Sequence, residues 1–295
     1  GLVGLHYGAV SWKTEIADRG YFQLSGDDHK YRDWKKWGHG RVNMDKAVIE
    51  SCDTYFYEMA VRLGIDQMSE GMQHFGFGRR QSRDIQGDLP GILPSRDWKR
   101  SARNQPWFLG ETVISGIGQG FWVTTPLQLA AATTAMARRG NFIEPHFSVL
   151  EDVDAGAPVP IGDSMDWERM IDAMEDVLHG ERGTARSAAR GLNYRIAGKT
   201  GTAQVVGIGQ DEEYEAAELE EELRDHALFV GFAPADSPSI VVALIIENGG
   251  SGGTTAAPVA RKIFDYWLLD RNEGSRPPNT NYVAKINQRV LESKH

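Results

Sequence analysis

Three runs of strand-forming residues in the last third of the chain place the strongest constraint on its fold. The first run leads into the segment 199–204, and two apolar runs follow at 227–232 and 240–246. The segment 234–238, which begins and ends with proline, is the predicted turn between the second and third strands. A helix-period pattern over 257–268 follows, and we expect this helix to pack back on the sheet.

The segment Lys199-Thr200-Gly201-Thr202 combines one cation, two hydroxyls and a residue without a Cβ. On a strand, the side chains of Lys199 and Gly201 lie on one face and those of the two threonines on the other. Such an edge suits an acyl substrate that carries a carboxylate. Lys199 supplies positive charge, a threonine hydroxyl donates a hydrogen bond, and Gly201 leaves the backbone open to pairing. The Thr202 amide is then placed to donate to a developing oxyanion.

A second motif, Ser51-Cys52-Asp53, interrupts a helix-period apolar pattern that spans 44–63. Ser51 and Asp53 are good N-cap residues, so one helix should end near Glu50 and another begin near Asp53. Lys-Thr-Gly and Ser-Asp-Asn are two of three signatures found in penicillin-binding proteins and class A β-lactamases. Ser-x-Asp is an altered form of the second signature.

Another helix start is marked by Thr125, Pro126 and Gln128, which form a capping box with proline at the first helical position. This helix should run to about Arg139. The region 79–106 holds prolines, glycines and many charges, which predicts a loop-rich surface. Further helices are expected over 66–75, 164–179 and 183–191.

Residues 1–40 have poor hydrophobic periodicity and are predicted to form loops and short strands. The segment 31–40 is the part densest in aromatic residues, glycine and charge. We expect Trp34 and Trp37 in this segment to pack the loop rather than to stack on a substrate.

Charge and cysteine content exclude several classes of protein. The formal net charge is −9, and residues 211–225 contribute −8 of it, so the remaining chain offers no basic stripe for nucleic acid. The acidic segment is expected to be a solvated excursion. No run reaches the length of a transmembrane helix, and the single cysteine excludes an internal disulfide.

A metal site is also predicted, from Asp18, Asp33, His39 and Cys52. One thiolate, one imidazole and two carboxylates form a complete tetrahedral ligand set for Zn²⁺. The first three residues lie in loops rich in glycine and aromatics that could fold back on the Ser51-Cys52-Asp53 junction. The simpler alternative for Cys52 is a small apolar residue at a helix start.

Taken in order, these motifs resemble the transpeptidase domain of class B penicillin-binding proteins, of the elongation type. The resemblance covers about residues 8–270. It implies an α+β fold, like that of penicillin-binding proteins and serine β-lactamases, in which helices flank an antiparallel sheet and a mostly helical lobe faces it across the active site. The segments that carry it are 31–40, 51–57, 116–128 and 199–204.

The resemblance also implies roles for the site residues. Ser51 would hydrogen-bond a general-base lysine and relay a proton to the leaving amine, and Asp53 would orient this network where most relatives have asparagine. Lys199, Thr200, Gly201 and Thr202 would bind the donor as described above. The implied reaction transfers the acyl group of a D-Ala-D-Ala stem peptide of peptidoglycan to an amine of a neighbouring stem, and β-lactams would acylate the same site. No cofactor is required for this chemistry.

One signature is absent: no serine in the chain has a lysine three residues later. The family's nucleophile is the serine of Ser-x-x-Lys, and by alignment we expect it a few residues before Gly1, together with the first strands of the sheet. We therefore expect residues 1–270 to be a transpeptidase domain that is incomplete at its amino end, and residues 271–295 to be a tail.

Partners and location follow only from the family. They would be an upstream membrane helix outside this chain, the periplasmic face of the bacterial inner membrane, and a polytopic glycosyltransferase of the elongation machinery. Two alternatives stay open. One is a serine β-lactamase or D,D-carboxypeptidase of the same fold, and the other is a binding or scaffold domain without catalysis.

Overall fold

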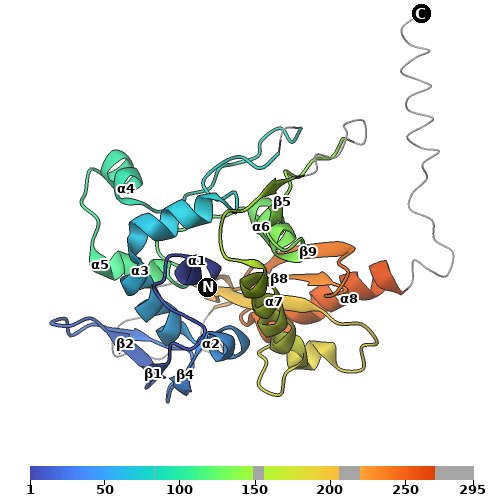
Figure 1. Cartoon of the computed structure of the whole chain (residues 1–295), viewed down its shortest axis with the longest axis horizontal. Coiled ribbons are helices and arrows are strands. Elements are labelled where there is room, and N and C mark those ends of the chain that lie inside the picture. Colours follow the sequence, from blue (N-terminus) through green and yellow to red (C-terminus); the bar gives the residue numbers. More distant parts are fainter. Residues whose placement is uncertain (83, 149–155, 206–219, 270–295) are drawn as a thin grey trace, which may run out of the picture.

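The computed structural model describes residues 1–82, 84–148, 156–205 and 220–269 (Figure 1). The helices are α1 (Leu2–His6), α2 (Met44–Glu50), α3 (Asp53–Gln73), α4 (Arg96–Arg103), α5 (Leu109–Ser115), α6 (Pro126–Ala137), α7 (Ser164–His179) and α8 (Ala257–Leu268). Three short helical segments are the 3₁₀ turns η1 (Arg186–Ala189) and η2 (Glu221–Leu223) and the π-helical turn η3 (Gly252–Ala256).

All the strand pairs in the described residues are antiparallel. The strands are β1 (Ile16–Asp18), β2 (Tyr21–Gln23), β3 (Lys30–Arg32), β4 (Gly40–Val42), β5 (Asn141–Phe142), β6 (Ala157–Pro158), β7 (Ala197–Ala203), β8 (His226–Ala233) and β9 (Ile240–Ile246). The larger sheet has the order β7-β8-β9, while β1 pairs with β4, β2 with β3, and β5 with β6.

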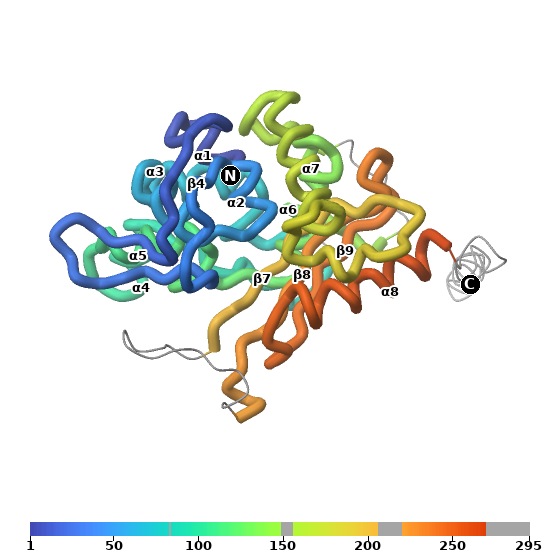
Figure 2. The backbone as a smooth tube through the Cα atoms, turned by 90° about the horizontal axis from the view of Figure 1, so that it is seen from below, coloured from blue at the N-terminus to red at the C-terminus, as the bar shows by residue number. Residues whose placement is uncertain are grey.

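The sheet and the helical lobe occupy different sides of the molecule. Figure 1 shows β8, β9 and α8 on one side and α3, α4 and α5 on the other, with the N-terminus between them. Figure 2, turned by 90°, keeps the same separation. This arrangement is the α+β architecture predicted from the sequence.

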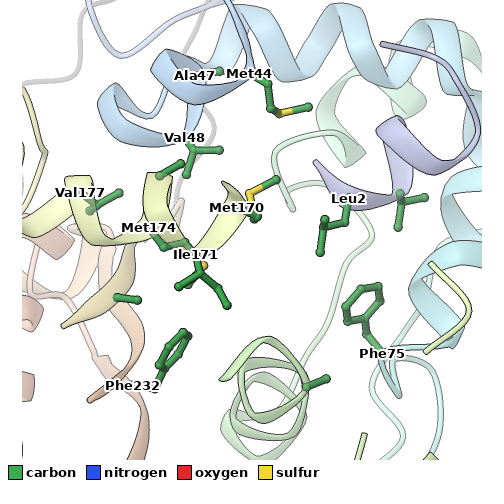
Figure 3. Packing of buried hydrophobic residues seen from close by; sticks show 14 of the residues in the cluster. Leu2, Met44, Ala47, Val48, Phe75, Met170, Ile171, Met174, Val177 and Phe232 are labelled. Carbon is green, nitrogen blue, oxygen red and sulfur yellow. The ribbon is translucent and has the colours of Figure 1, made fainter. Parts of the chain in front are cut away.

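Helix α7 holds the two sides together. It contacts α2 on one side and β7 on the other, and its buried side chains join those of both elements in one core. Figure 3 shows Met170 and Met174 of α7 between Val48 of α2 and Phe232 of β8. At the carboxyl end of α7, His179 Nε2 accepts a hydrogen bond of 3.0 Å from the amide of Ile196, which fixes the helix to the start of β7.

Several predicted boundaries are confirmed. Helix α2 ends at Glu50 and α3 begins at Asp53, as predicted, although the N-cap of α3 is Cys52 rather than Ser51 or Asp53. The capping box of α6 is present, because Thr125 Oγ1 accepts from the amide of Gln128 and the Gln128 side chain accepts from the amide of Thr125. Helix α8 spans 257–268 as predicted.

Other predictions were wrong in detail. The region 79–106 contains α4, and residues 1–40 contain α1, although both were predicted without helix. The expected separate helix over 66–75 continues α3, which is broken only at Gly64, where φ is 76° and ψ is 157°. By contrast, helix α7 has the predicted range 164–179, and its N-cap is Asp163.

Most of the acidic segment, and the predicted tail 271–295, lie outside the described residues. The domain boundary at residue 270 therefore stays a prediction. Among the helices of the described ranges, none combines the length and the apolar character that crossing a bilayer requires.

Candidate active site

The junction between α2 and α3 positions Ser51. Asn43 caps the start of α2 through a hydrogen bond from the Lys46 amide to Asn43 Oδ1. At the other end of α2, Ser51 adopts the left-handed conformation, with φ of 56° and ψ of 52°, and so turns the chain out of the helix. Cys52 is extended and occupies the N-cap position of α3 without a capping hydrogen bond from its side chain, and the first residue of the helix is Asp53. Three consecutive residues therefore take three different conformations.

The two main motifs meet, although 148 positions separate them. Lys199 Nζ lies 2.8 Å from Ser51 Oγ and 3.0 Å from the carbonyl oxygen of Thr200. Packing explains the meeting, because α7 contacts both α2, which leads into Ser51, and β7, which carries Lys199. The contact satisfies the geometric condition for one shared site, while the catalytic roles of these residues remain predictions.

Burial and charge move two pKa values toward neutrality. Burial lowers the pKa of Lys199 to about 8, although the carboxylate of Asp53 acts in the opposite direction. Burial and the nearby charge of Asp33 raise the pKa of Asp53 to about 7, and the Trp34 amide and Lys199 partly offset this rise. A weakly held proton on each of two neighbouring groups suits proton transfer near neutral pH.

Strand β7 has an open edge. It is an outer strand of the described sheet, paired only with β8. The carbonyls of Thr200 and Thr202 accept side-chain hydrogen bonds from Lys199 Nζ and from Gln119 Nε2, the latter at 2.8 Å, so both carbonyls point away from β8. In an antiparallel strand the N–H and C=O of one residue face the same side. The Thr202 amide therefore faces the open edge.

The opposite side of β7 is supported from within the chain. Thr200 Oγ1 lies 2.9 Å from Thr184 Oγ1. Turn η3 crosses β7 so closely that a Cβ on Gly252 would lie 2.5 Å from the carbonyl oxygen of Gly201 and 2.4 Å from that of Leu228. Only glycine permits this approach of two backbones. Thr184 and η3 thus support β7, the strand that carries the candidate binding residues, on the side away from its open edge.

The four predicted metal ligands also come together. One ligand atom from each of Asp18, Asp33, His39 and Cys52 lies within 4.8 Å of all the others, and all four residues are buried. His39 Nδ1 is 2.7 Å from Asp18 Oδ2 and 3.4 Å from Asp33 Oδ1, and Cys52 Sγ is 3.5 Å from Asp18 Oδ2.

The chemistry of this cluster fits a divalent cation. Burial and the charge of Asp33 raise the pKa of the Cys52 thiol. Burial alone would lower the pKa of His39, but hydrogen bonds to Asp33 and Asp18 raise it above the ordinary value. Two buried carboxylates beside a thiol concentrate negative charge that Zn²⁺ would neutralise. His39 Nε2 is buried without a hydrogen-bond partner, so the cluster is not satisfied by the chain alone.

The cluster of predicted metal ligands and the motif of Ser51 are joined through the segment 33–34. Asp33 Oδ2 accepts a hydrogen bond from the amide of Thr54, and the amide of Trp34 donates to Asp53 Oδ2, each at 3.1 Å. Trp34 and Trp37 were expected to pack this loop, but their exposed fractions are 62% and 84%. The expectation holds in part for Trp34, whose ring lies edge-on to that of His39 with centroids 5.5 Å apart, and was wrong for Trp37.

Sequence reasoning missed the contacts that Trp34, Thr184 and Gln119 make with Ser51, Thr200 and Thr202. Gln119 lies in the segment 116–128, which carries the family resemblance, but no role was predicted for its side chain. Nothing in the sequence paired Thr184 with Thr200 or Trp34 with Ser51.

This architecture, with Ser51 facing the lysine of an outer strand, defines a class of protein. The family model described as "Penicillin binding protein transpeptidase domain" matches residues 2–265, and the chain belongs to that family. Among curated proteins it is 49% identical over 288 residues to "Peptidoglycan D,D-transpeptidase MrdA" of Acinetobacter baumannii, covering 94% of this chain and 42% of that protein. The chain spans less than half the length of the curated MrdA relatives it matches.

Solved structures give the same assignment. The crystal structure of Pseudomonas aeruginosa PBP2 in complex with WCK 5153 matches with a TM-score of 0.82 and 43% identity, over 95% of this chain and 59% of that one. The Helicobacter pylori complex between PBP2 and MreC matches with a TM-score of 0.77 and 30% identity, over 92% and 48% of the two chains. The chain is therefore similar to penicillin-binding protein 2 in both sequence and fold.

Proposed function

We propose that this chain is the main part of a peptidoglycan D,D-transpeptidase domain, which cross-links stem peptides and is acylated by β-lactams. The hydrogen bond between Lys199 Nζ and Ser51 Oγ, beside the open edge of β7, carries the proposal. It places a cation, a hydroxyl and unpaired backbone groups around one small volume.

Each residue then has a task in acyl transfer. The ammonium of Lys199 attracts the terminal carboxylate of the D-Ala-D-Ala donor, and Thr202 contributes its hydroxyl to that carboxylate and its amide to the oxyanion. Ser51 Oγ relays a proton to the nitrogen of the departing D-alanine. Asp53 stabilises the positive charge of Lys199.

The attacking serine of Ser-x-x-Lys lies outside this sequence. In the proposed reaction its oxygen forms an ester with the carbonyl carbon of the penultimate D-alanine as the C–N bond breaks and D-alanine leaves. An acceptor amine then attacks the ester, a new amide bond forms, and the serine regains its proton. A segment ahead of Gly1 would enter through α1, which contacts both α3 and α7 at the middle of the molecule (Figure 1).

The test uses the full-length protein, including Ser-x-x-Lys, with a donor peptide ending in D-Ala-D-Ala and an acceptor stem that carries a free amine. We expect release of D-alanine and a cross-linked dimer, both lost in Lys199→Ala. Release of D-alanine without a dimer would favour the carboxypeptidase, and rapid hydrolysis of penicillin would favour the β-lactamase. No reaction and no penicillin adduct would leave the scaffold alternative.

A structural zinc ion is the second part of the proposal, with Asp18, Asp33, His39 and Cys52 as ligands. The mutual approach of the four buried ligand atoms supports it. Bound zinc would neutralise the buried carboxylates and stabilise the loop that contacts Asp53 and Thr54. We expect one zinc per purified chain and a lower melting temperature in Cys52→Ala. The absence of zinc in the wild type, or unchanged stability in the variant, would reject this site.

Partners and location are proposed from the family. One similar structure is a complex of PBP2 with MreC, and another belongs to a peptidoglycan synthase complex. By analogy, we propose that this domain works beside a polytopic glycosyltransferase on the periplasmic face of the inner membrane, anchored by a helix outside the given sequence. Co-purification of the full-length protein with that partner from membranes tests this point.

A further inference from the structure

Trp34 makes hydrogen bonds that are unusual for so exposed a side chain. Its indole Nε1 donates to the carbonyl oxygen of Ser51 at 2.9 Å and to that of Glu50 at 3.2 Å. Yet 62% of the residue is exposed to solvent, so its ring contributes little to the core.

The carbonyl that Trp34 holds belongs to a residue in a rare conformation. Ser51 has φ of 56° and ψ of 52°, a region that residues with a Cβ seldom occupy. The peptide group that follows it is fixed at both ends. Its oxygen accepts from Trp34, and its nitrogen, the amide of Cys52, donates to the carbonyl of Ala47 at 3.0 Å.

This conformation determines where the serine hydroxyl lies. Ser51 Oγ is 2.8 Å from Lys199 Nζ, and a return of Ser51 to a common backbone region would rotate its Cβ away from β7. The position of Trp34 is itself fixed, because its amide donates to Asp53 Oδ2 and the neighbouring Asp33 accepts from the amide of Thr54. The loop that carries Trp34 is therefore fixed, and its indole N–H donates a hydrogen bond to the backbone of Ser51.

We propose that Trp34 is a positioning residue for acyl transfer, whose indole N–H holds Ser51 in the left-handed conformation that directs its hydroxyl to Lys199. This inference rests on the proposed function. Tryptophan suits the task because its nitrogen is a hydrogen-bond donor only and lies at the edge of a wide, rigid ring. Phenylalanine keeps most of that ring and removes the donor.

The experiment compares Trp34→Phe with wild type in the full-length protein, by measuring the rate of acylation by a fluorescent penicillin as a function of its concentration. Trp37→Phe is the matched control, because Trp37 lies three residues away, is 84% exposed, and makes no contact with Ser51 among the described interactions. We expect the limiting acylation rate to fall about tenfold in Trp34→Phe, the effect of one lost hydrogen bond, without change in Trp37→Phe.

Two further readouts separate positioning from a general structural role. The dissociation constant of the non-covalent penicillin complex should stay within twofold of wild type, because Trp34→Phe leaves the carboxylate site intact. The double variant Trp34→Phe/Ser51→Ala should be no slower than Ser51→Ala alone, since Trp34 acts only through Ser51. Melting temperature and bound metal should also stay at wild-type values.

An unchanged limiting rate in Trp34→Phe would overturn the inference, as would a full additional loss in the double variant. Equal losses in Trp34→Phe and Trp37→Phe would also overturn it, because they would indicate a general effect of the loop. Failure of the proposed function has a different signature, since wild-type protein would then take up no penicillin at all.

Discussion

Raising the pH through the pKa of Lys199 should weaken the recognition of substrates that carry a carboxylate. Burial lowers this pKa to about 8, against 10.5 for an ordinary lysine. A lysine is charged below its pKa, so about nine tenths of the Lys199 side chains are ammonium at pH 7 and about one tenth at pH 9. If the ammonium binds the carboxylate, the part of the acylation rate that depends on this ion pair falls about tenfold over those two pH units.

The assay must separate Lys199 from other groups that titrate in the same range. We therefore compare the second-order acylation rate constant of a penicillin with that of its methyl ester, which reacts at the same carbonyl but lacks the carboxylate. The general-base lysine affects both compounds, so the ratio of their rate constants reports only the groups that act on the carboxylate, which are Lys199 and, through its charge, Asp53. We expect this ratio to fall about tenfold from pH 7 to pH 9.

Lys199→Arg provides the control, because arginine keeps its charge throughout this range. The ratio should be independent of pH in that variant, even if its absolute rate is lower. A ratio that does not decline in the wild type, or that declines equally in Lys199→Arg, would refute the role assigned to Lys199.

Three further predictions concern the same site. Lys199→Met should stabilise the protein at pH 7 by about 1 to 3 kcal/mol in a denaturant titration. The reason is that the pKa of Lys199 is lower in the folded chain, so the unfolded chain binds the proton more tightly. This gain in stability should shrink as the pH rises from 8 toward 10.5, and a constant gain would contradict the prediction. Gln119→Ala should speed penicillin acylation by up to about tenfold, because the loss of the amide donor frees the Thr202 carbonyl for pairing with the donor substrate. Slower acylation would instead indicate that Gln119 is a binding residue. Gly252→Ala should cost about 2 kcal/mol or more of stability, because its Cβ would lie 2.5 Å from the carbonyl oxygen of Gly201; an unchanged melting curve would exclude this packing.

Local signals in the sequence were sufficient for the elements that carry the two motifs. The N-cap residues around Cys52 located the junction of α2 and α3, and continuous apolar runs located β8 and β9. Helix α4 was missed because the residue that it buries is a lysine, so its sequence lacks the apolar spacing of an amphipathic helix. A lysine is usually expected at the surface, but Lys99 is 1% exposed, and its Nζ lies 4.6 Å from the ring centroid of Phe108. An amphipathic pattern cannot show a lysine whose ammonium is buried among aromatic rings.

The site was predictable to a different degree in each of its parts. The sequence motifs identified Ser51 and Lys199, and the residue types identified the four predicted metal ligands. Hydrophobic periodicity predicts neither the contact between Ser51 and Lys199 nor the clustering of the four ligands. The contacts of Trp34 and Gln119 depend on loop backbones with unusual dihedral angles, such as Gly118 and Gly120 with φ of 76° and 75°. Such hydrogen bonds follow from the folded loop and have no period or spacing in the sequence.

Mass spectrometry of the full-length protein after exposure to benzylpenicillin tests the central claim most directly. A transpeptidase site around Ser51 and Lys199 predicts one covalent adduct per chain that persists for hours after excess penicillin is removed, and that forms much more slowly in Lys199→Ala. Absence of an adduct in the wild type, or equally fast labelling of Lys199→Ala, would contradict the account.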